Sequence, residues 1–217
     1  MNAVMESVRI PATGVLLEAD VAVPDPARGV VLFAHGSGSS RLSPRNRFVA
    51  GELRTVGIGT VLADLLTREE ENVDTVTGTL RFDIGMLAGR LLDLADWLRG
   101  YEPAAGLGHG LFGASTGAAA ALVAAAARPD TIRAVVSRGG RPDLAEGSLA
   151  SVRQPTLLIV GGRDHEVLRL NREAMREIPG ETRLDVVPGA THLFEEPGAL
   201  DRVAHLAADW FTRHLAA

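Results

Sequence analysis

The sequence predicts a doubly wound α/β fold, in which a mostly parallel sheet of about eight strands has helices on both faces. Short apolar runs without alternation recur along the chain, as expected for strands that are covered on both sides. Segments with apolar residues at helical spacing separate these runs. The chain has 217 residues, enough for one domain with a sizeable core and few for two, so we expect one domain over 1–217.

The expected elements follow one another in a regular order. An amphipathic hairpin comes first, with strands over Ser7–Ile10 and Val15–Val23. Further strands are expected over 29–34, 58–63, 132–137, 156–160 and 183–187 and just before Gly113, with helices over 44–56, 79–98, 118–127, 166–177 and 199–215. The polar, acidic stretch 65–78 is expected to be a solvated loop that can form one rim of a pocket. The connection 138–155 is too short for a separate lid domain.

The most informative stretch is Gly-x-Ser-x-Gly at 113–117, between a short buried strand and an alanine-rich helix. This is the context of a nucleophile elbow, in which a serine occupies a tight and strained turn. Gly113 and Gly117 would let the strand and the helix approach closely. Ser115 would then lie at the carboxyl end of the sheet. The amide of Thr116 would start the helix and favour negative charge beside the serine.

Two more groups follow strand ends. Asp164 and His192 come shortly after the strands expected over 156–160 and 183–187. Because parallel strands end at one edge of the sheet, these side chains are expected to meet Ser115 there. Histidine can remove the serine proton, and a buried carboxylate can fix the imidazole tautomer.

Two backbone amides are expected to complete this site. The amide of Ser37, after the strand over 29–34, and the amide of Thr116 would form an oxyanion hole.

Five motifs in this order carry a resemblance to a known family. They are FAHGSGSS at 33–40, LFGASTGAAAAL at 111–122, SRGGRPDL at 137–144, LLIVGGRD at 157–164 and PGATHLFEEPG at 188–198. The chain resembles an α/β-hydrolase of the dienelactone-hydrolase-like group, in the small lidless branch whose relatives occur fused or adjacent to phosphoribosyltransferase domains. The resemblance implies Ser115 as nucleophile, Asp164 as acid and His192 as base. Dienelactone hydrolases proper use a cysteine nucleophile, which this chain lacks, so their substrate is not carried over.

Several other polar residues have two interpretations. His35 either contacts substrate or orders the oxyanion loop through hydrogen bonds, and the second is favoured. Asp64 is an alternative acid, although a carboxylate at that place commonly caps the next segment. Arg138 and Arg141 could hold a carboxylate or phosphate of an anionic substrate. Alternatively, they brace the loop of His192 by pairing with acidic residues, for which the candidates are Asp143, Glu146, Glu195 and Glu196.

Composition excludes several classes of function. A net charge of −5 with interspersed signs gives no basic face for nucleic acid and no polybasic membrane anchor. The absence of cysteine excludes disulfides, a thiolate nucleophile and cysteine metal sites. A metal cluster of Asp164, His165 and His192 has no supporting motif spacing, so no metal or cofactor is expected. Residues 1–11 lack an apolar signal-peptide core, and a cytoplasmic monomer or homodimer is expected.

These observations predict a serine hydrolase that acts on an ester, thioester or lactone of a small molecule. One alternative is a phosphate- or nucleotide-binding module built on Gly36-Ser37-Gly38. Arg41 stands where the dinucleotide fingerprint needs a third glycine, and no GK[ST] follows. The other alternative is an inactive member of the fold that binds a partner.

Overall fold

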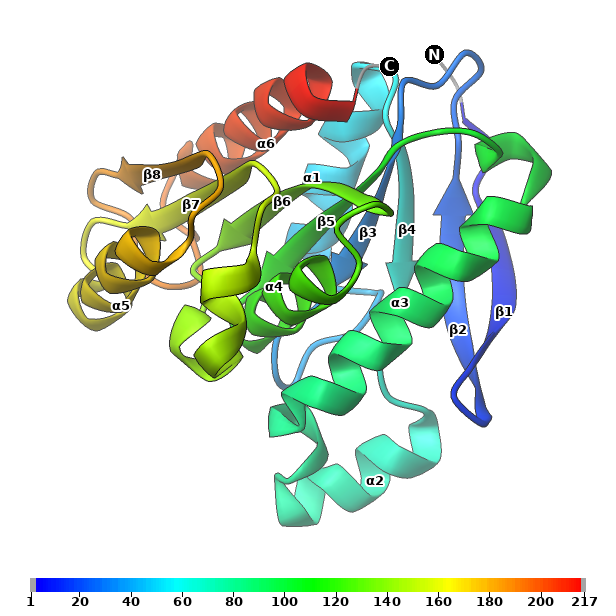
Figure 1. The fold of residues 1–217 in the computed structure, drawn as a ribbon, viewed down its shortest axis with the longest axis horizontal. Helices are drawn as coiled ribbons and strands as arrows, with labels where there is room; N and C mark the ends of the chain where they lie inside the picture. Colours follow the sequence, from blue (N-terminus) through cyan, green and yellow to red (C-terminus); the bar gives the residue numbers. More distant parts are fainter. Residues whose placement is uncertain (1–2, 216–217) are drawn as a thin grey trace.

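A computed structural model of the protein describes residues 3–215 and confirms the predicted fold class. One eight-stranded sheet runs in the order β1-β2-β4-β3-β5-β6-β7-β8 (Figure 1). The β1–β2 and β2–β4 pairs are antiparallel, and all other neighbouring strands are parallel. The strands are β1 Glu6–Ala12, β2 Val15–Ala22, β3 Val30–Ala34, β4 Gly59–Ala63, β5 His109–Ala114, β6 Ile132–Arg138, β7 Thr156–Gly161 and β8 Thr182–Val187.

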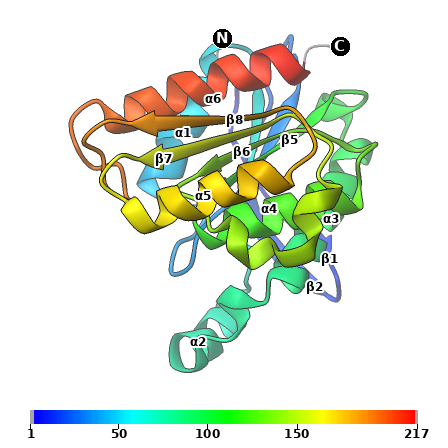
Figure 2. The same cartoon turned by 60° about the vertical axis from the view of Figure 1, so that its left-hand side comes forward.

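Helices cover both faces of this sheet. They are α1 Pro44–Thr55, α2 Arg68–Thr77, α3 Ile84–Gly100, α4 Thr116–Ala127, α5 His165–Glu177 and α6 Ala199–Leu215, with 3₁₀ turns η1 Leu80–Phe82, η2 Glu102–Ala104 and η3 Pro142–Ser151. Figures 1 and 2 show α1 and α6 on one face and α3, α4 and α5 on the other. The apolar core is divided by the sheet in the same way. The consecutive residues Leu111 and Phe112 of β5 point to opposite faces: Leu111 belongs to the cluster that includes α3 and α4, and Phe112 to the cluster that includes α1 and α6.

The central strand and helix explain the alanine-rich composition around the elbow. All six residues of β5 are buried, and nine of the twelve residues of α4 are buried as well. Alanine side chains let α4 pack against α3, β5 and β6 without a wide gap. No helix of residues 3–215 is long and apolar enough to cross a membrane.

The expected solvated loop at 65–78 is wrong, because this stretch contains α2. Thr67 accepts a hydrogen bond from the Glu70 amide at 3.2 Å, and the Glu70 carboxylate accepts one from the Thr67 amide at 2.8 Å. This capping box and the glutamates of the first turn stabilise the start of the helix. Gly78, at φ 66°, ends it. Figures 1 and 2 show α2 projecting from the body of the molecule.

The helix expected over 79–98 also begins later than predicted. The Asp83 side chain accepts a hydrogen bond from the Met86 amide at 2.9 Å and caps α3 at Ile84. The preceding residues form η1 instead. As a result η1 lies between α2 and α3, where Arg81 lines a cavity together with residues of α2 and of the loop after β3.

Candidate active site

Ser115 lies at the sharp turn between β5 and α4. Its backbone has φ 50° and ψ −119°, a strained conformation for a residue with a side chain. A Cβ at Gly113 would overlap Ala118, and a Cβ at Gly117 would overlap the Ala34 carbonyl, so both positions need glycine. The sequence prediction of an elbow at 113–117 therefore agrees with the geometry of the turn.

Main-chain hydrogen bonds from the neighbouring loop hold this turn. The Ser115 amide donates to the Arg138 carbonyl at 3.2 Å, and the Arg141 amide donates to the Ser115 carbonyl at 3.1 Å. Between these two contacts, Gly139 adopts φ 52°. The loop after β6 thus fixes the serine backbone without using a side chain.

Asp164 and His192 meet as the sequence predicts. His192 Nδ1 and Asp164 Oδ2 are 2.6 Å apart, so Nδ1 donates to the carboxylate and Nε2 is left as the basic nitrogen. A Cβ on Gly139 would lie 3.5 Å from the His192 ring. Ser115 and His192 therefore both contact residues 138–139, although no hydrogen bond joins their side chains in the described structure.

The loop that carries His192 is held by its own acidic residues. Glu196 accepts a hydrogen bond from the Thr191 amide at 3.0 Å. Glu195 pairs with Arg45, at the start of α1, at 3.1 Å. Phe194 adopts φ 55° and is buried against the core on the α1 and α6 face. These contacts place the histidine over the end of the sheet.

Asp64, the alternative acid, is engaged elsewhere. Its carboxylate accepts a hydrogen bond from the Arg41 amide at 2.6 Å and forms an ion pair with the Arg41 guanidinium. The same guanidinium lies 2.7 Å from Glu18. Asp64 therefore caps the segment that follows β3, and the pairing with His192 falls to Asp164.

One of the two expected oxyanion-hole amides is not free. The Ser37 amide donates to Thr116 Oγ1 at 2.9 Å. Thr116 is the first residue of α4, so its own amide has no partner within the helix. The structure thus brings Ser37 and Thr116 together beside Ser115, but it occupies the Ser37 amide with a side-chain hydroxyl.

His35 orders the oxyanion loop, as the favoured interpretation expected. Its Nε2 accepts a hydrogen bond from the Leu65 amide at 3.0 Å, so Nδ1 carries the proton and contacts the Gly36 carbonyl at 3.1 Å. Burial lowers the pKa of His35, and the contact with Gly36 opposes that shift only in part. The neutral ring therefore links the loop after β3 to the loop after β4.

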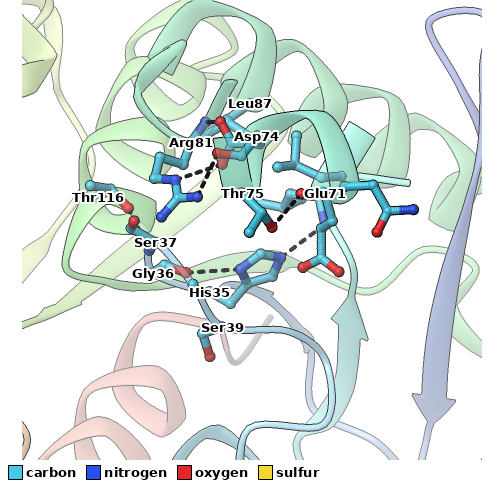
Figure 3. Close-up of a pocket in the computed structure, with 14 residues that line it drawn as sticks. His35, Gly36, Ser37, Ser39, Glu71, Asp74, Thr75, Arg81, Leu87 and Thr116 are labelled. Atoms are coloured by element: carbon cyan, nitrogen blue, oxygen red, sulfur yellow. Dashed lines mark hydrogen bonds and ion pairs between the residues drawn. The ribbon is translucent and has the colours of Figure 1, made fainter. Parts of the chain in front are cut away.

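A cavity of about 240 Å³ opens beside this loop (Figure 3). Its lining comes from the oxyanion region and from α2 and η1: His35, Ser37, Thr116, Glu71, Asn72, Asp74, Thr75 and Arg81, with Leu65, Leu66 and Leu87. In Figure 3 the Arg81 guanidinium points toward Ser37 and Thr116. Arg81 Nε donates to the Asp74 carboxylate at 2.6 Å. The sequence analysis missed Asp74 and Arg81, whose signal was the capping box that makes α2 a helix.

The two arginines at the end of β6 and in the loop after it, Arg138 and Arg141, have different surroundings. Arg141 forms a bidentate pair with Asp143, at 2.8 and 2.6 Å, which agrees with the bracing interpretation. Arg138 is 8% exposed, pairs with no carboxylate among the described side chains, and leaves Nη1 buried without a partner. Burial and the positive charge of Arg45 lower the pKa of Arg138 to about 10. The side chain of Glu146, another bracing candidate, lies outside the described part.

Among the described residues, no three histidine or acidic side chains form a candidate metal cluster. His165 begins α5 and its side chain is exposed. At the strand ends, the described structure brings together Ser115, the Asp164–His192 pair and the amino end of α4.

Comparison with solved structures identifies the same fold in related proteins. A dienelactone hydrolase from Anabaena variabilis is 54% identical, covers 98% of this chain and 99% of its own, and superposes with a TM-score of 0.96. Est1E from Butyrivibrio proteoclasticus, at 15% identity and a TM-score of 0.79, covers 95% of this chain and 98% of its own. A serine hydrolase without lid from Xanthomonas campestris, at 21% identity, covers 98% of this chain and 96% of its own with a TM-score of 0.77.

Curated relatives share the sequence over a part of their length. Proteins of two Mycobacterium tuberculosis strains, provisionally named phosphoribosyl transferases, are 58% identical over 97% of this chain. The match covers 46% of those proteins, so the chain spans about half their length. No family model matches the chain. The near-complete match to the Anabaena protein, together with the elbow and the sheet topology, shows that this chain belongs to the dienelactone-hydrolase family of α/β-hydrolases.

Proposed function

We propose that the protein is a serine hydrolase that cleaves an ester, thioester or lactone of a small molecule through an acyl-enzyme. The observation that carries the proposal is Ser115 in a strained elbow, with the Asp164–His192 pair formed by the loops after β7 and β8. The lactone-cleaving name of the 54% identical Anabaena protein supports this substrate class.

The geometry suggests a two-step acyl transfer. His192 Nε2 takes the proton of Ser115 Oγ as the oxygen attacks the carbonyl carbon, and the charge on the carbonyl oxygen is stabilised by donors at the start of α4. The tetrahedral intermediate collapses, and His192 gives its proton to the departing alkoxide or thiolate. Water, deprotonated by His192, then cleaves the acyl-serine ester. Asp164 stabilises the imidazolium in both steps without being protonated.

The two alternative functions have less support. The loop at 36–38 packs against the elbow: a Cβ on Gly36 would lie 3.1 Å from the Ser115 Cβ. One of its amides already donates to Thr116, which leaves the loop a poor cradle for a phosphate. For the M. tuberculosis relatives, we attribute the transferase name to the half of their length that this chain does not match. An inactive binding module would have no need of the strained serine.

Covalent labelling tests the proposal. A fluorophosphonate probe followed by intact mass measurement should add one adduct to the wild type and none to Ser115→Ala, which should also lose about 10⁴- to 10⁶-fold in turnover with little change in stability. Ser39→Ala is a matched control, because Ser39 lines the cavity together with Thr116, the residue after Ser115. Labelling that persists in Ser115→Ala, or an unlabelled wild type, would overturn the assignment.

The substrate is further proposed to carry an anionic group, which Arg138 binds. Register places Arg138 beside Ala114, the residue before Ser115, and Arg45 adds a second positive charge nearby. A buried guanidinium without a carboxylate is costly, which favours a site that an anion completes. No carboxylate in the described structure competes for Arg138.

Replacement of the two arginines separates binding from bracing. Arg138→Met should raise KM for acidic esters by about ten- to a hundredfold, spare neutral esters, and leave the melting temperature equal or higher because an unpaired buried charge is lost. Arg141→Met, which breaks the pair with Asp143, should affect acidic and neutral esters alike. If Arg138→Met weakens both ester types equally and melts earlier, Arg138 braces the loop and the anionic preference is wrong.

A further inference from the structure

The hydrogen bond between the two parts of the expected oxyanion hole has a defined direction. Ser37 contributes its single N–H, and Thr116 Oγ1 is the acceptor at 2.9 Å. An amide has one proton, so Ser37 cannot direct it fully at a substrate oxygen while this bond is kept. The amide that the sequence assigns to the hole therefore acts on Thr116 in this structure.

The Thr116 hydroxyl keeps a proton of its own. A hydroxyl can donate once and accept twice, and in the described structure Thr116 Oγ1 only accepts. Thr116 is 4% exposed, lines the cavity and directly follows Ser115. Figure 3 shows it next to Ser37 at one end of the cavity. The free proton is thus available at the cavity, on the residue that directly follows Ser115.

We propose that the Thr116 hydroxyl is a direct donor of the oxyanion hole, with the Ser37 amide behind it. The donor chain runs from the Ser37 N–H to Thr116 Oγ1, and from its proton to the substrate oxygen. Hydrogen bonds in such a chain polarise one another, so acceptance from Ser37 makes the hydroxyl a stronger donor. The Thr116 amide, at the start of α4, gives the second bond. Thr116 then supplies both donors, and Ser37 is a positioning residue.

This arrangement explains the residue type at the start of α4. A β-branched side chain has one strongly preferred rotamer or two, so threonine holds its hydroxyl more firmly than serine would. The alternative is that the hydroxyl only occupies the Ser37 amide until substrate displaces it. The two possibilities differ in one respect: removal of the hydroxyl frees the Ser37 amide, which helps catalysis only in the alternative.

The inference rests on the serine-hydrolase function proposed above, and Thr116→Val tests it. Valine keeps the shape of threonine and removes the hydroxyl. We expect kcat on a neutral nitrophenyl ester to fall about 10²- to 10³-fold with KM nearly unchanged, as for loss of one oxyanion donor. Thr116→Ser, which restores the hydroxyl, should lie within about tenfold of the wild type. Thr75→Val is the matched control, because the Thr75 hydroxyl also lines the cavity but donates to the Glu71 carbonyl at 2.7 Å.

Each outcome has a defined meaning. A Thr116→Val enzyme with the wild-type kcat, or a faster one, overturns the inference and leaves the proposed function intact. A loss of kcat that Thr116→Ser does not restore also overturns it, because a packing role would then explain the effect. If the wild type neither hydrolyses esters nor reacts with the fluorophosphonate, the proposed function fails and the inference fails with it. If Thr116→Val does not fold, as judged by thermal melting, Thr116→Ala removes the same hydroxyl within the space available.

Discussion

Two sides of the cavity are held in different ways. One is the elbow, which contributes Thr116, and the other is the α2 wall, which consists of Glu71, Asn72, Asp74 and Thr75. The elbow is fixed by the main-chain hydrogen bonds that Ser115 donates to Arg138 and accepts from Arg141, and by the absence of side chains at Gly113 and Gly117. The α2 wall is fixed by charged side chains. Arg90 of α3 pairs with Glu70 at 2.5 Å, and it also donates to the Leu65 carbonyl at 2.6 Å.

This contrast suggests a division of labour. Strained backbone persists only where its surroundings determine it fully, which suits the atoms that do the chemistry. The α2 wall is held by a few ion pairs, so its residues can be replaced without moving the strand ends. Such a wall is suited to determining which substrate binds. Damage to the elbow side should therefore remove turnover, whereas damage to α2 should change stability and substrate affinity.

The largest effect is expected from the acid of the proposed triad. Asp164→Asn should lower kcat about 10³- to 10⁴-fold, because an amide favours the wrong tautomer of His192. Asp64→Asn is the matched control, since Asp64 also follows a strand but pairs with Arg41. Steady-state kinetics on a nitrophenyl ester measures both. An inactive Asp64 variant beside a normal Asp164 variant would show that the acid has been misassigned.

The next effect concerns the stability of the α2 wall. Glu70→Gln should lower the free energy of unfolding by about 2 kcal/mol, because the Arg90 charge is buried and would lose its partner. KM should rise while kcat on a short ester stays within a few-fold of the wild type. Asp96→Asn, which breaks the exposed pair with Arg128, should cost about 0.5 kcal/mol or less. Denaturant unfolding compares the two variants, and equal losses would show that the α2 pair has no special weight.

Sequence reasoning worked best where function constrains the backbone. The Gly-x-Ser-x-Gly spacing needs a strand, a turn and a helix around Ser115, so one short motif predicted the local structure. Asp164 and His192 followed from the rule that parallel strands end at one edge, and their side chains do meet. Apolar runs without alternation predicted buried strands in a mostly parallel sheet, and the observed strand order confirms this prediction.

The missed features depend on side-chain partners that are distant in the chain. The polar composition of 65–78 favoured a loop, whereas the capping box at Thr67 and Glu70 indicates the start of the helix α2. Whether the Ser37 amide is free depends on the rotamer of Thr116, 79 residues away. The sequence alone does not distinguish the role of Arg138 from that of Arg141. Only the structure shows that one pairs with Asp143 and the other with no described carboxylate.

A smaller effect is expected from the loop that lies between the elbow and His192. Gly139→Ala should lower kcat about tenfold or more, because the new methyl group would lie 3.3 Å from the His192 carbonyl oxygen, so the backbone that carries the His192 ring would have to shift. Positive φ also costs about 1 kcal/mol of stability for alanine. Gly106→Ala is the matched control: Gly106 has φ 77° with no neighbour within 4 Å. Both variants should melt earlier, and only Gly139→Ala should lose turnover. Equal turnover in the two would place His192 beyond the influence of Gly139.

The smallest effect is a dependence of stability on pH that arises from the oxyanion loop. Burial lowers the pKa of His35, and burial with the charges of Arg99 and Arg133 lowers the pKa of His109. In the unfolded chain both histidines titrate near the ordinary value of about 6.5, so below that pH the unfolded state binds more protons than the folded state. Stability is therefore full above about pH 6.5 and falls as the pH decreases toward the folded-state values.

The variant His35→Gln measures how much of this pH dependence of stability comes from His35. Its free energy of unfolding at pH 7.5 should be lower than that of the wild type, because the contacts with Leu65 and Gly36 are altered. Its slope against pH between 5 and 6.5 should nevertheless be shallower, since one neutral buried imidazole has been removed. Urea unfolding at four or more pH values measures the slope. A wild-type slope near zero would mean that His35 is protonated in the folded state, which its acceptance of the Leu65 amide at Nε2 forbids.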